Sequence, residues 1–403
     1  MLLRFKFSNF RSFADEQELS LIAARGGENP EVVFHPAGVD EGVLGACAIY
    51  GANASGKSNT LKALQFMAQA VISSQQAWPP SRGILSLDQF ISKRFETSHY
   101  EIDCIVQGVR YSYGFIADGE RFHQEWLLAY PKGHKQTWFR REFGKSISFG
   151  SYLPGANRAI ERLTRENSLF LSAAAQNGHE ALLPLYNWFE KSILIFDEKR
   201  GNLPAQVLED CDHADWFKDL VRLFLSVADV GIEDVQLIKV EAGLGAGSLK
   251  VKLSHRIGKE ISLFDLQNES AGTVALLGLL GPVIHALVSG AVLGIDEMDA
   301  SLHPLVTAQI IKLFNSPMNK QKAQLIFTTH DTNLLSSGNL RRDQVWFTEK
   351  NAQGESSLYP LSDFKPRLQE NLEKGYLQGR YGGVPFLNAD AFLTAFGDAH
   401  GKK

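Results

Sequence analysis

Residues 51–58 read Gly-Ala-Asn-Ala-Ser-Gly-Lys-Ser, and this string limits the possible folds more than any other part of the chain. Glycines at its first and sixth positions allow backbone angles that a side chain would block, so that successive N–H groups can turn inward. The lysine adds a positive charge, and the last serine adds a hydroxyl suited to Mg²⁺. The string therefore predicts a phosphate-binding P-loop. The residues expected to contact a nucleotide here are Gly51, Asn53, Ala54, Ser55, Gly56, Lys57, Ser58 and Asn59.

The segments on both sides of this string agree with a P-loop. Residues 46–50 form a short apolar run that suits a buried strand, and residues 59–66 carry apolar side chains at helical spacing. A strand, a glycine-rich loop and a helix N-terminus together make an anion site through geometry and through the helix dipole. The alternative is a glycine-rich turn that matches by chance, and both flanks argue against it.

The bulk composition narrows the class of protein. A chain of 403 residues can hold two or three domains, and its net charge of −4 gives no general attraction to nucleic acid. The cysteines lie far apart without C-x-x-C spacing, which argues against disulfides and structural zinc and suits a reducing cytosol. Residues 1–7 alternate like a strand and lack the apolar core of a signal peptide. We therefore expect a cytoplasmic protein.

Residues 271–295 carry no formal charge and are long enough to span a membrane. We expect instead a buried helix over 271–289 and a core strand over 291–295. Pro282 interrupts the helical pattern, and His285 would be costly in lipid. The acidic pair that follows this strand explains it better than a membrane does, so no membrane contact is expected.

The strand expected over 291–295 runs directly into Asp296 and Glu297, within the string AVLGIDEMDASLHP. An apolar strand that ends in two acids is a Walker B pattern, in which the first acid holds Mg²⁺ and the second orients or deprotonates the attacking water. We therefore expect Asp296 to bind the metal and Glu297 to act in catalysis. The alternative is an acidic strand end that faces solvent.

Two further segments indicate contacts with phosphate. Residues 323–331 form another buried strand with a polar end, and its His330 is placed to reach a γ-phosphate, because open α/β sheets bind ligands at the C-terminal edge of their strands. A structural histidine is the alternative. Ser270 and Gly272 stand at the start of the long apolar helix, where unpaired N–H groups make an anion site. An ordinary helix N-cap is the alternative there.

The order of these motifs resembles the ABC-type ATPases of the RecF, SMC and OLD group. Within that group the chain is most similar to the short bacterial AAA-family ATP-binding proteins that are often encoded beside an effector in phage-defence loci. Residues 7–13 match the group's N-terminal arm, and residues 379–386, which read Gly-Arg-Tyr-Gly-Gly-Val-Pro-Phe, resemble its recurrent tail. The resemblance covers nearly the whole chain.

The resemblance implies roles that spacing alone does not supply. In such ATPases two heads close face to face around two ATP molecules, each with Mg²⁺. Ser270 and Gly272 of one head would then contact the γ-phosphate that Lys57 of the other head holds. Asp299 would lie in the segment that crosses between heads, and Arg11 stands where the family often has a basic residue near the nucleotide. The chain has Glu-Ser-Ala-Gly-Thr where transporter-type proteins have LSGGQ.

The same resemblance divides the site into catalytic and metal-binding residues. It gives catalytic roles to Lys57, Glu297 and His330. It gives the Mg²⁺ site to Ser58 and Asp296, with Gln89 as a candidate for the Q-loop that ABC-type ATPases add to this site.

The rest of the chain sets the subtype. The segment between Lys57 and Ser270 lacks the long heptads of a rod-bearing SMC protein, so a DNA-bridging role is not expected. Residues 100–145 are typical of β-hairpins, and glycine-rich turns are expected near 243–247. No acidic set typical of a TOPRIM nuclease follows the ATPase motifs. The remaining expected elements are strands over 100–106, 109–116 and 344–348, and helices over 157–175, 179–192 and 365–374.

These observations predict an α/β P-loop NTPase fold, namely an ABC-type ATPase head with a β-rich N-terminal lobe and a helical insert. The expected domains are an N-terminal ATPase lobe (1–145), a mainly helical insert (146–235), a C-terminal ATPase lobe (236–350) and a C-terminal extension (351–403).

The function expected first is an ATP-dependent switch in anti-phage defence. The switch is a homodimer (with higher oligomers left open) whose open or closed state controls a partner effector.

One alternative is a RecF-like DNA-repair ATPase that binds DNA through a basic run around Trp138 and Phe139, since basic and aromatic side chains together suit single-stranded nucleic acid. A solvated hairpin explains the run equally well. A nuclease with a site in 150–240 or 341–403 is a weaker alternative. The run consists of Lys132, Lys135, Arg140, Arg141 and Lys145.

Overall fold

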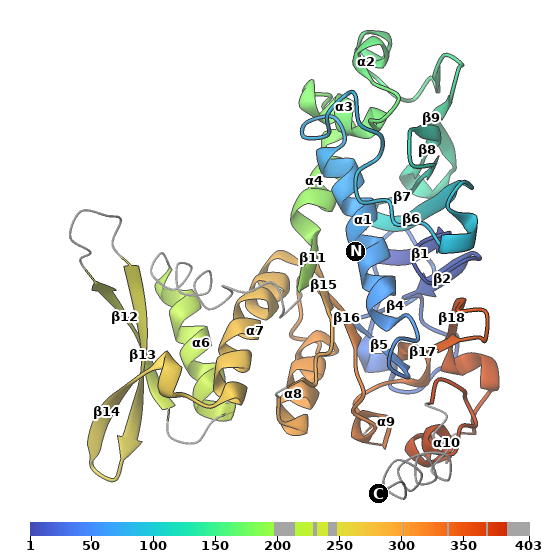
Figure 1. Cartoon of the computed structure of the whole chain (residues 1–403). Helices are drawn as coiled ribbons and strands as arrows, with labels where there is room; N and C mark the ends of the chain where they lie inside the picture. The colour runs from blue at the N-terminus through green and yellow to red at the C-terminus, as the bar shows by residue number, and fades with distance from the viewer. Residues whose placement is uncertain are drawn as a thin grey trace, which may run out of the picture.

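The computed structural model describes residues 1–196, 214–228, 232–240, 248–300, 302–336, 338–367 and 370–384. Two large sheets enclose one long helix, and a smaller three-stranded sheet lies at one end of the molecule (Figure 1). The turns expected near 243–247 and the last residues of the expected tail lie outside the described residues.

The first large sheet is mainly parallel. Its strands, in spatial order, are β11 (Ile193–Phe196), β15 (Val292–Ile295), β16 (Gln324–Thr328), β5 (Ala46–Gly51), β17 (Val345–Lys350) and β18 (Ser356–Pro360). The first five are parallel, and β18 pairs with β17 in the antiparallel sense. Strands covered on both faces read as continuous apolar runs, which is why the motif strands could be recognised in the sequence. Their C-terminal ends meet at one edge of the sheet.

The second large sheet is antiparallel. Its strands, in spatial order, are β10 (Ser148–Phe149), β9 (Gln136–Glu142), β8 (Phe122–Tyr130), β7 (Val109–Ala117), β6 (Ser98–Val106), β1 (Leu2–Ser8) and β2 (Gln17–Ser20). Side chains of β1 and β6 alternate between buried and partly exposed, as expected for a sheet with one covered face. The hairpins predicted for residues 100–145 are confirmed. A two-stranded sheet joins β3 (Val33–Phe34) and β4 (Val43–Leu44).

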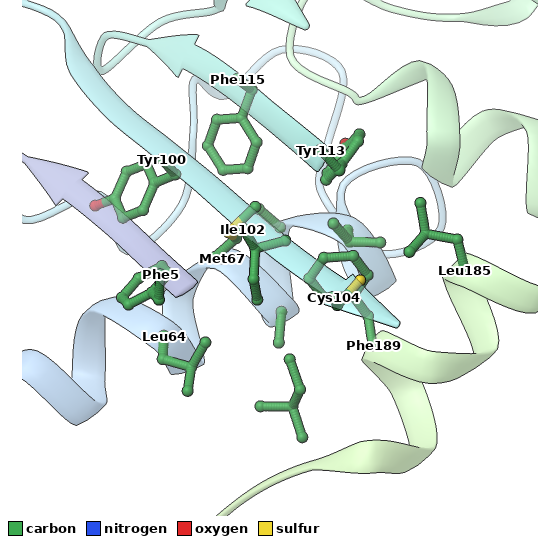
Figure 2. Close-up of a cluster of buried hydrophobic side chains, with 14 of the residues drawn as sticks. Phe5, Leu64, Met67, Tyr100, Ile102, Cys104, Tyr113, Phe115, Leu185 and Phe189 are labelled. Carbon is green, nitrogen blue, oxygen red and sulfur yellow. The ribbon is translucent and has the colours of Figure 1, made fainter. Parts of the chain in front are cut away.

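Helix α1 (Lys57–Ser73) lies between the two large sheets. Its Leu64 and Met67 pack against Phe5, Tyr100 and Ile102 of the antiparallel sheet (Figure 2). On its other side α1 packs on the parallel sheet. There a Cβ atom on Gly294 would lie only 3.2 Å from the Leu61 side chain and 2.6 Å from that of Ile195, so glycine permits the close approach. The helix that follows the P-loop is thus held from both faces.

The opposite face of the parallel sheet carries α7 (Ala271–Ser289), α8 (Pro304–Phe314), α9 (Asn333–Ser336) and α10 (Leu372–Leu377). Successive residues of β5 show how the sheet separates two cores. Cys47 and Ile49 join the core around α1, whereas Ala46, Ala48 and Tyr50 join the core beneath α7 and α8. This alternation follows from the period of two in a strand.

The helix predicted over 271–289 is confirmed as α7, and Pro282 lies inside it instead of interrupting it. Within the described part of the chain, α7 is the one helix long and apolar enough to cross a bilayer. A buried core helix passes the same test. Leu279 and Val283 of α7 are buried against the parallel sheet, and Leu277 and Leu280 are buried against the neighbouring lobe.

That neighbouring lobe consists of α6 (Asp215–Ala228) and the antiparallel strands β12 (Ile232–Val240), β13 (Ser248–Ile257) and β14 (Glu260–Asp265). Its core joins Val221 and Leu225 of α6 to Val235 and Leu253 of the sheet and to α7. The lobe stands at the left of the molecule, away from the antiparallel seven-stranded sheet (Figure 1). The sequence did not predict these three strands.

The helices expected over 157–175 and 179–192 are instead three shorter ones, α2 (Asn157–Leu163), α3 (Phe170–Gln176) and α4 (Leu183–Ser192). The break before α3 has a physical cause. Leu169 is extended, and the buried Glu125 carboxylate accepts the first N–H groups of α3, from Phe170 at 2.6 Å and Leu171 at 3.0 Å. The stretch expected to be mainly helical also supplies β11 to the parallel sheet.

Near the C-terminus, the strand expected over 344–348 is confirmed as β17. The helix expected over 365–374 is wrong at its start, because Lys365 has φ +48° and precedes a proline, and α10 begins only at Leu372. Six short 3-10 helices complete the described elements. They are η1 (Pro30–Val32), η2 (Ile91–Lys93), η3 (Pro131–Gly133), η5 (Leu266–Asn268), η6 (Arg342–Gln344) and η7 (Leu361–Phe364).

Candidate functional site

The glycine-rich loop lies between the end of β5 and the start of α1, at the C-terminal edge of the parallel sheet. Gly51 has φ +156°, Gly56 has φ +122° and Ala54 has φ +61°. A side chain on Gly56 would also collide with its surroundings, since a Cβ there would lie 2.8 Å from Ser356 Oγ and 3.0 Å from the Phe13 ring. Both the backbone angle and the available space therefore require glycine at position 56.

A threonine on the next strand supports this loop. Thr348 Oγ1 of β17 lies 2.6 Å from Ser55 Oγ and donates a 3.3 Å hydrogen bond to the Tyr50 carbonyl oxygen. Both hydroxyl groups are buried, so the bonds fix the loop against the sheet. Nothing in the sequence around Thr348 pointed to this role.

Lys57 lies at the first position of α1, and its side chain is held over the loop. Its Nζ donates to the carbonyl oxygens of Gly51 at 2.9 Å and Ala52 at 3.1 Å. Burial lowers the pKa of Lys57, and the carboxylates of Asp296 and Glu297 oppose this shift. The lysine charge is therefore aimed into the same space as the two acids that follow β15.

Asp296 accepts hydrogen bonds from two hydroxyl groups that belong to separate elements. Ser58 Oγ, in the first turn of α1, donates to Asp296 Oδ1 at 2.9 Å, and Thr328 Oγ1, at the end of β16, donates to the same oxygen at 2.7 Å. A carboxylate beside a serine hydroxyl is a set of hard oxygen donors, which Mg²⁺ prefers. Two of the three residues expected at the Mg²⁺ site, Ser58 and Asp296, are thus in contact, whereas Thr328 had no assigned role in the sequence.

Glu297 has an unusual backbone conformation. Its φ of +54° lies in the left-handed region, which costs a non-glycine residue about 1–2 kcal/mol. The Glu297 N–H donates to Thr328 Oγ1 at 2.7 Å, so the same threonine binds both acidic residues. Sparsely populated backbone angles gather at functional sites, where the surroundings hold them. The arrangement turns the Glu297 backbone sharply away from the line of β15.

His330 and Asp299 complete this edge of the sheet. The His330 N–H donates to both carboxylate oxygens of Asp299, at 3.1 and 3.2 Å. Partial burial and then the Lys57 charge lower the pKa of His330, against the opposing effects of Asp299 and Glu297. Because its ordinary pKa is already near 6.5, the imidazole is neutral at pH 7 and one ring nitrogen can donate a hydrogen bond.

The N-terminal arm flanks the start of α1. Asn59 Nδ2 donates to Ser12 Oγ at 2.9 Å, and Arg11, with φ +52°, pairs with Asp88 at 2.7 Å. Gln89 follows Asp88, and its side-chain amide donates to the Glu96 carbonyl oxygen. The structure therefore pairs Arg11 with Asp88, the residue before Gln89, and the Gln89 amide is bonded inside its own loop.

Ser270 and Gly272 begin α7. Ser270 Oγ accepts a 3.0 Å hydrogen bond from the Thr273 N–H, which is an N-cap. Helix α7 packs with α6 and β14's sheet at one end of the molecule, whereas α1 packs with the antiparallel sheet (Figure 1). Within one chain, the described contacts of Ser270 thus lie in the first turn of its own helix.

The basic run is partly used in the structure itself. Arg141 is nearly buried, donates to the Ser168 and Arg165 carbonyl oxygens, and lies 3.5 Å from the Glu125 carboxylate. Lys145 pairs with Glu142 at 2.5 Å. Arg141 is therefore not free to meet phosphate groups, whereas the Lys145 side chain, in a surface pair, stays 72% exposed. Among the described residues, no group of three or more His, Cys, Asp or Glu residues could hold a metal ion without other ligands.

A comparison with protein families identifies the chain. Residues 47–336 match the family described as "AAA domain, putative AbiEii toxin, Type IV TA system", which is well over half of the sequence. The chain belongs to this family. The match runs from β5 through the P-loop, Asp296 and His330, so it contains the cluster described above. The fold is accordingly the α/β P-loop ATPase fold of the ABC-type head, as predicted. Arg11 and the C-terminal tail lie outside the matched range.

The solved structures that the chain matches include heads of SMC proteins. An SMC head bound to the C-winged helix domain of ScpA is 15% identical, with 91% of this chain and 99% of that chain covered and a TM-score of 0.42. The SMC head domain from Thermotoga maritima is 15% identical, with 89% of this chain and 98% of that chain covered and a TM-score of 0.42. An SMC head domain with an extended coiled coil, bound to the C-terminal domain of ScpA derived from Pyrococcus furiosus, is 14% identical. The match covers 90% of this chain and 97% of that chain, with a TM-score of 0.39. No curated protein matches the chain.

Proposed function

We propose that this protein binds and hydrolyses ATP with Mg²⁺ and uses the cycle as a molecular switch. The observation that carries the proposal is the cluster at one edge of the parallel sheet. There Lys57, Ser58, Asp296, Glu297 and His330 come together from α1, β15 and β16, beside a glycine loop with the required backbone angles. P-loop sites use this set of groups for phosphoryl transfer.

Each residue then has a defined task. The loop N–H groups and Lys57 hold the β- and γ-phosphates, and Ser58 and Asp296 would hold Mg²⁺, which neutralises charge on those phosphates when bound. Glu297 orients a water and takes its proton as the water oxygen attacks the γ-phosphorus. The bond to the β–γ bridging oxygen breaks, and ADP leaves with that oxygen. The neutral His330 donates a hydrogen bond to the γ-phosphate.

The switch itself is a head-to-head homodimer. Ser270 and Gly272 of one copy would complete the site that Lys57 of the other copy forms, with Asp299, Arg11 and Gln89 at its edges. ATP then favours the closed dimer because it contacts both copies at once. The family description names a "putative AbiEii toxin" of a type IV toxin–antitoxin system, and a two-component system of this kind supports a role beside a partner protein. We also propose that this partner is an effector and that the pair acts in the cytoplasm, in anti-phage defence.

Two substitutions test this function. Glu297→Gln should bind ATP, hydrolyse it at least about a hundredfold more slowly, and accumulate as a dimer, because the base is lost while the binding groups remain. Lys57→Ala should lose ATP affinity itself. The measurements are phosphate release, binding of a fluorescent ATP analogue, and sedimentation velocity with and without ATP. Wild-type turnover of Glu297→Gln would remove Glu297 from its role, and wild-type ATP affinity of Lys57→Ala would remove the P-loop assignment.

Direct DNA binding, the RecF-like alternative, has weaker support. The internal contacts of Arg141 leave Lys132, Lys135, Arg140 and Lys145 as the basic groups of the run that can meet nucleic acid. Stimulation of ATP hydrolysis by DNA, and its loss in Arg140→Ala, would favour this alternative over an effector-coupled switch.

A further inference from the structure

Helix α10 and the turn that follows it bring the chain back to the P-loop. The turn places Gly383 against the first glycine of the loop: a Cβ atom on Gly383 would lie 3.6 Å from Gly51 Cα and 3.5 Å from the Thr348 carbonyl oxygen. The φ of Gly383 is +67°, an angle that favours glycine. Thr348 is also the residue whose hydroxyl bonds to Ser55 of the loop. This part of the chain therefore packs directly on the residues that shape the P-loop.

Tyr376 of α10 holds this contact in place. Its hydroxyl donates to the Gly383 carbonyl oxygen at 3.1 Å. Its ring packs edge-on against the Tyr50 ring, with centroids 5.6 Å apart, and stacks on the Phe347 ring at 5.4 Å. Both partner rings come from β5 and β17, the strands on which the P-loop rests. Burial raises the pKa of Tyr376 to about 12, so the hydroxyl stays protonated at pH 7 and can donate.

The same helix reaches the strand end that carries His330. Thr332, two residues after His330, donates from its hydroxyl to Glu373 Oε1 of α10 at 2.9 Å. Tyr50 adds a second link, because its buried hydroxyl group donates to the Asp331 carbonyl oxygen at 3.0 Å. Helix α10 also lies beside α9, which follows this strand end (Figure 1). One helix therefore contacts both the P-loop and the segment with the histidine.

These two parts of the site must keep a fixed separation if both are to bind one triphosphate. In the proposed function the loop holds the β- and γ-phosphates and His330 donates to the γ-phosphate, and misplacement of such groups by about 1 Å can cost a hundredfold in rate. Tyr376 is only 6% exposed, and its printed contacts are with the protein itself. It therefore acts on the nucleotide through the groups that it holds.

We propose that α10 positions the nucleotide site, through Tyr376 for the P-loop and through Glu373 for the strand end with His330. The inference rests on the proposed ATP hydrolysis and adds two positioning residues that lie outside the range of the family match. The two contacts have different effects. Loss of the Tyr376 contact loosens the phosphate-binding loop and weakens ATP binding, whereas loss of the Glu373 contact displaces the histidine and slows turnover.

The P-loop contact is tested with Tyr376→Phe, which keeps the ring and removes the bond to Gly383. The ATP dissociation constant should rise about fivefold with kcat unchanged, because a loop held by one buried hydrogen bond fewer is in its binding form for a smaller fraction of the time. A fluorescent ATP analogue measures the affinity, and phosphate release measures kcat.

Tyr381→Phe is the matched control for this variant. Tyr381 is also buried and lies outside α10, and its hydroxyl donates to Glu370 Oε1 at 2.8 Å instead of to the P-loop support. It should bind ATP as the wild type does. Wild-type ATP affinity of Tyr376→Phe, or equal losses of affinity in the two variants, would overturn the role of Tyr376.

The histidine contact is tested with Glu373→Ala, which removes the acceptor of the Thr332 hydroxyl. We expect kcat to fall about tenfold at unchanged ATP affinity, because a small displacement of a group at the γ-phosphate affects the chemical step. Glu373→Gln should restore most of the rate, since its amide oxygen can accept the same hydroxyl although the charge is lost. Wild-type kcat of Glu373→Ala, or an equal loss in Glu373→Gln, would overturn the role of Glu373.

The outcome for the wild type separates this inference from the proposed function. A wild-type protein that neither binds nor hydrolyses ATP would overturn the proposed function and the positioning together. Normal ATP hydrolysis by the wild type, with neither Tyr376→Phe nor Glu373→Ala different from it, would overturn the positioning alone.

Discussion

Thr328 is the residue that joins the two halves of the acidic pair. Its hydroxyl donates to Asp296 Oδ1 at 2.7 Å and accepts from the Glu297 N–H at 2.7 Å. Because Thr328 is fully buried, water cannot replace these bonds. The left-handed backbone of Glu297 is therefore held by a side chain on a different strand, β16. Groups that orient metal ligands and catalytic residues in this way affect metal affinity and activity strongly, although they do not contact the metal themselves.

Thr328→Val keeps the shape of the side chain and removes both bonds. We expect ATP hydrolysis to fall between about tenfold and a hundredfold. The Glu297 N–H loses its Thr328 acceptor and Asp296 Oδ1 loses one of its two hydroxyl donors, which should lower the free energy of unfolding by about 1–3 kcal/mol. Phosphate release and urea unfolding measure the two effects. Thr328→Ser retains the hydroxyl and should keep most of the activity; equal losses in the serine and valine variants would show that packing, and not the hydroxyl, is what matters.

His330 gives the site a predictable response to pH. Partial burial and the Lys57 charge lower its pKa in the folded protein below the ordinary value of 6.5. The unfolded chain therefore binds more protons than the folded one below that pH, and stability falls as pH drops through 6.5 toward the lower folded pKa. Urea unfolding between about pH 7 and about pH 5 should show this loss, and His330→Gln should reduce it. If the free energy of unfolding of His330→Gln depends on pH as steeply as that of the wild type, other groups cause the pH dependence.

At the residue scale, the sequence predicted the charged members of the cluster but not the hydroxyl groups that hold them. Lys57, Asp296 and Glu297 belong to spaced motifs, so their proximity follows from strands that end at one sheet edge. Thr328 belongs to the polar strand end that also holds His330, and this strand end was predicted. Because ligands bind at the C-terminal edge of such sheets, Thr328 could have been predicted as a site residue in the same way as His330. Thr348 had no such signal, because its role depends on β17 pairing beside β5.

At the scale of elements, the antiparallel lobe and helix α3 are joined by one buried carboxylate. Glu125 is 0% exposed, and it accepts from the Tyr113 hydroxyl at 2.9 Å and from the first two N–H groups of α3. Burial raises the pKa of Glu125, and Arg141 and these donors oppose that shift. The basic run of β9 thus includes an arginine whose main contacts are internal.

Glu125→Leu should destabilise the protein strongly, because it leaves the Tyr113 hydroxyl and two N–H groups without their acceptor and removes the carboxylate that faces the Arg141 charge. Removing one partner of a buried ion pair lowers the free energy of unfolding by about 3–5 kcal/mol. Urea unfolding measures the loss, and Glu120→Ala is the control, since the Glu120 side chain is 77% exposed in its pair with Arg121. Stability equal to that of the wild type would mean that Glu125 is not needed to start α3.

Elements that adjoin a motif were predictable, and elements defined by distant partners were not. The strands before the P-loop and before Asp296, and helix α7, carry long apolar runs between clear stop signals. Strand β11 has only four residues directly after α4, and its partner β15 is about a hundred residues away. Strands β12 to β14 depend on α6 and α7 to cover one face, which local pattern does not reveal.

At the scale of the whole molecule, α7 connects the proposed catalytic edge to the lobe that carries β14. One side of α7 is buried against the parallel sheet, and Leu279 lies beside Glu297 and Met298 in a small cavity; the other side is buried against α6. Ser270 at its start is therefore placed by two cores at once. A helix fixed in this way can present its first turn rigidly to a second copy, which a site shared between copies requires.

A shared site makes a quantitative prediction for mixed dimers. Lys57→Ala destroys the P-loop half of the site, and Ser270→Arg blocks the other half, at a cost of about 1 kcal/mol in helix capping. Each variant alone should be inactive, because every site in its homodimer contains one damaged half. An equal mixture should form hetero-pairs in about half of the dimers, and each hetero-pair holds one site with both intact halves. Recovery of about a quarter of the wild-type phosphate release is therefore expected. Activity that stays at the level of the separate variants would mean that each chain builds its site alone, whereas near-quarter recovery requires Ser270 to act across the interface.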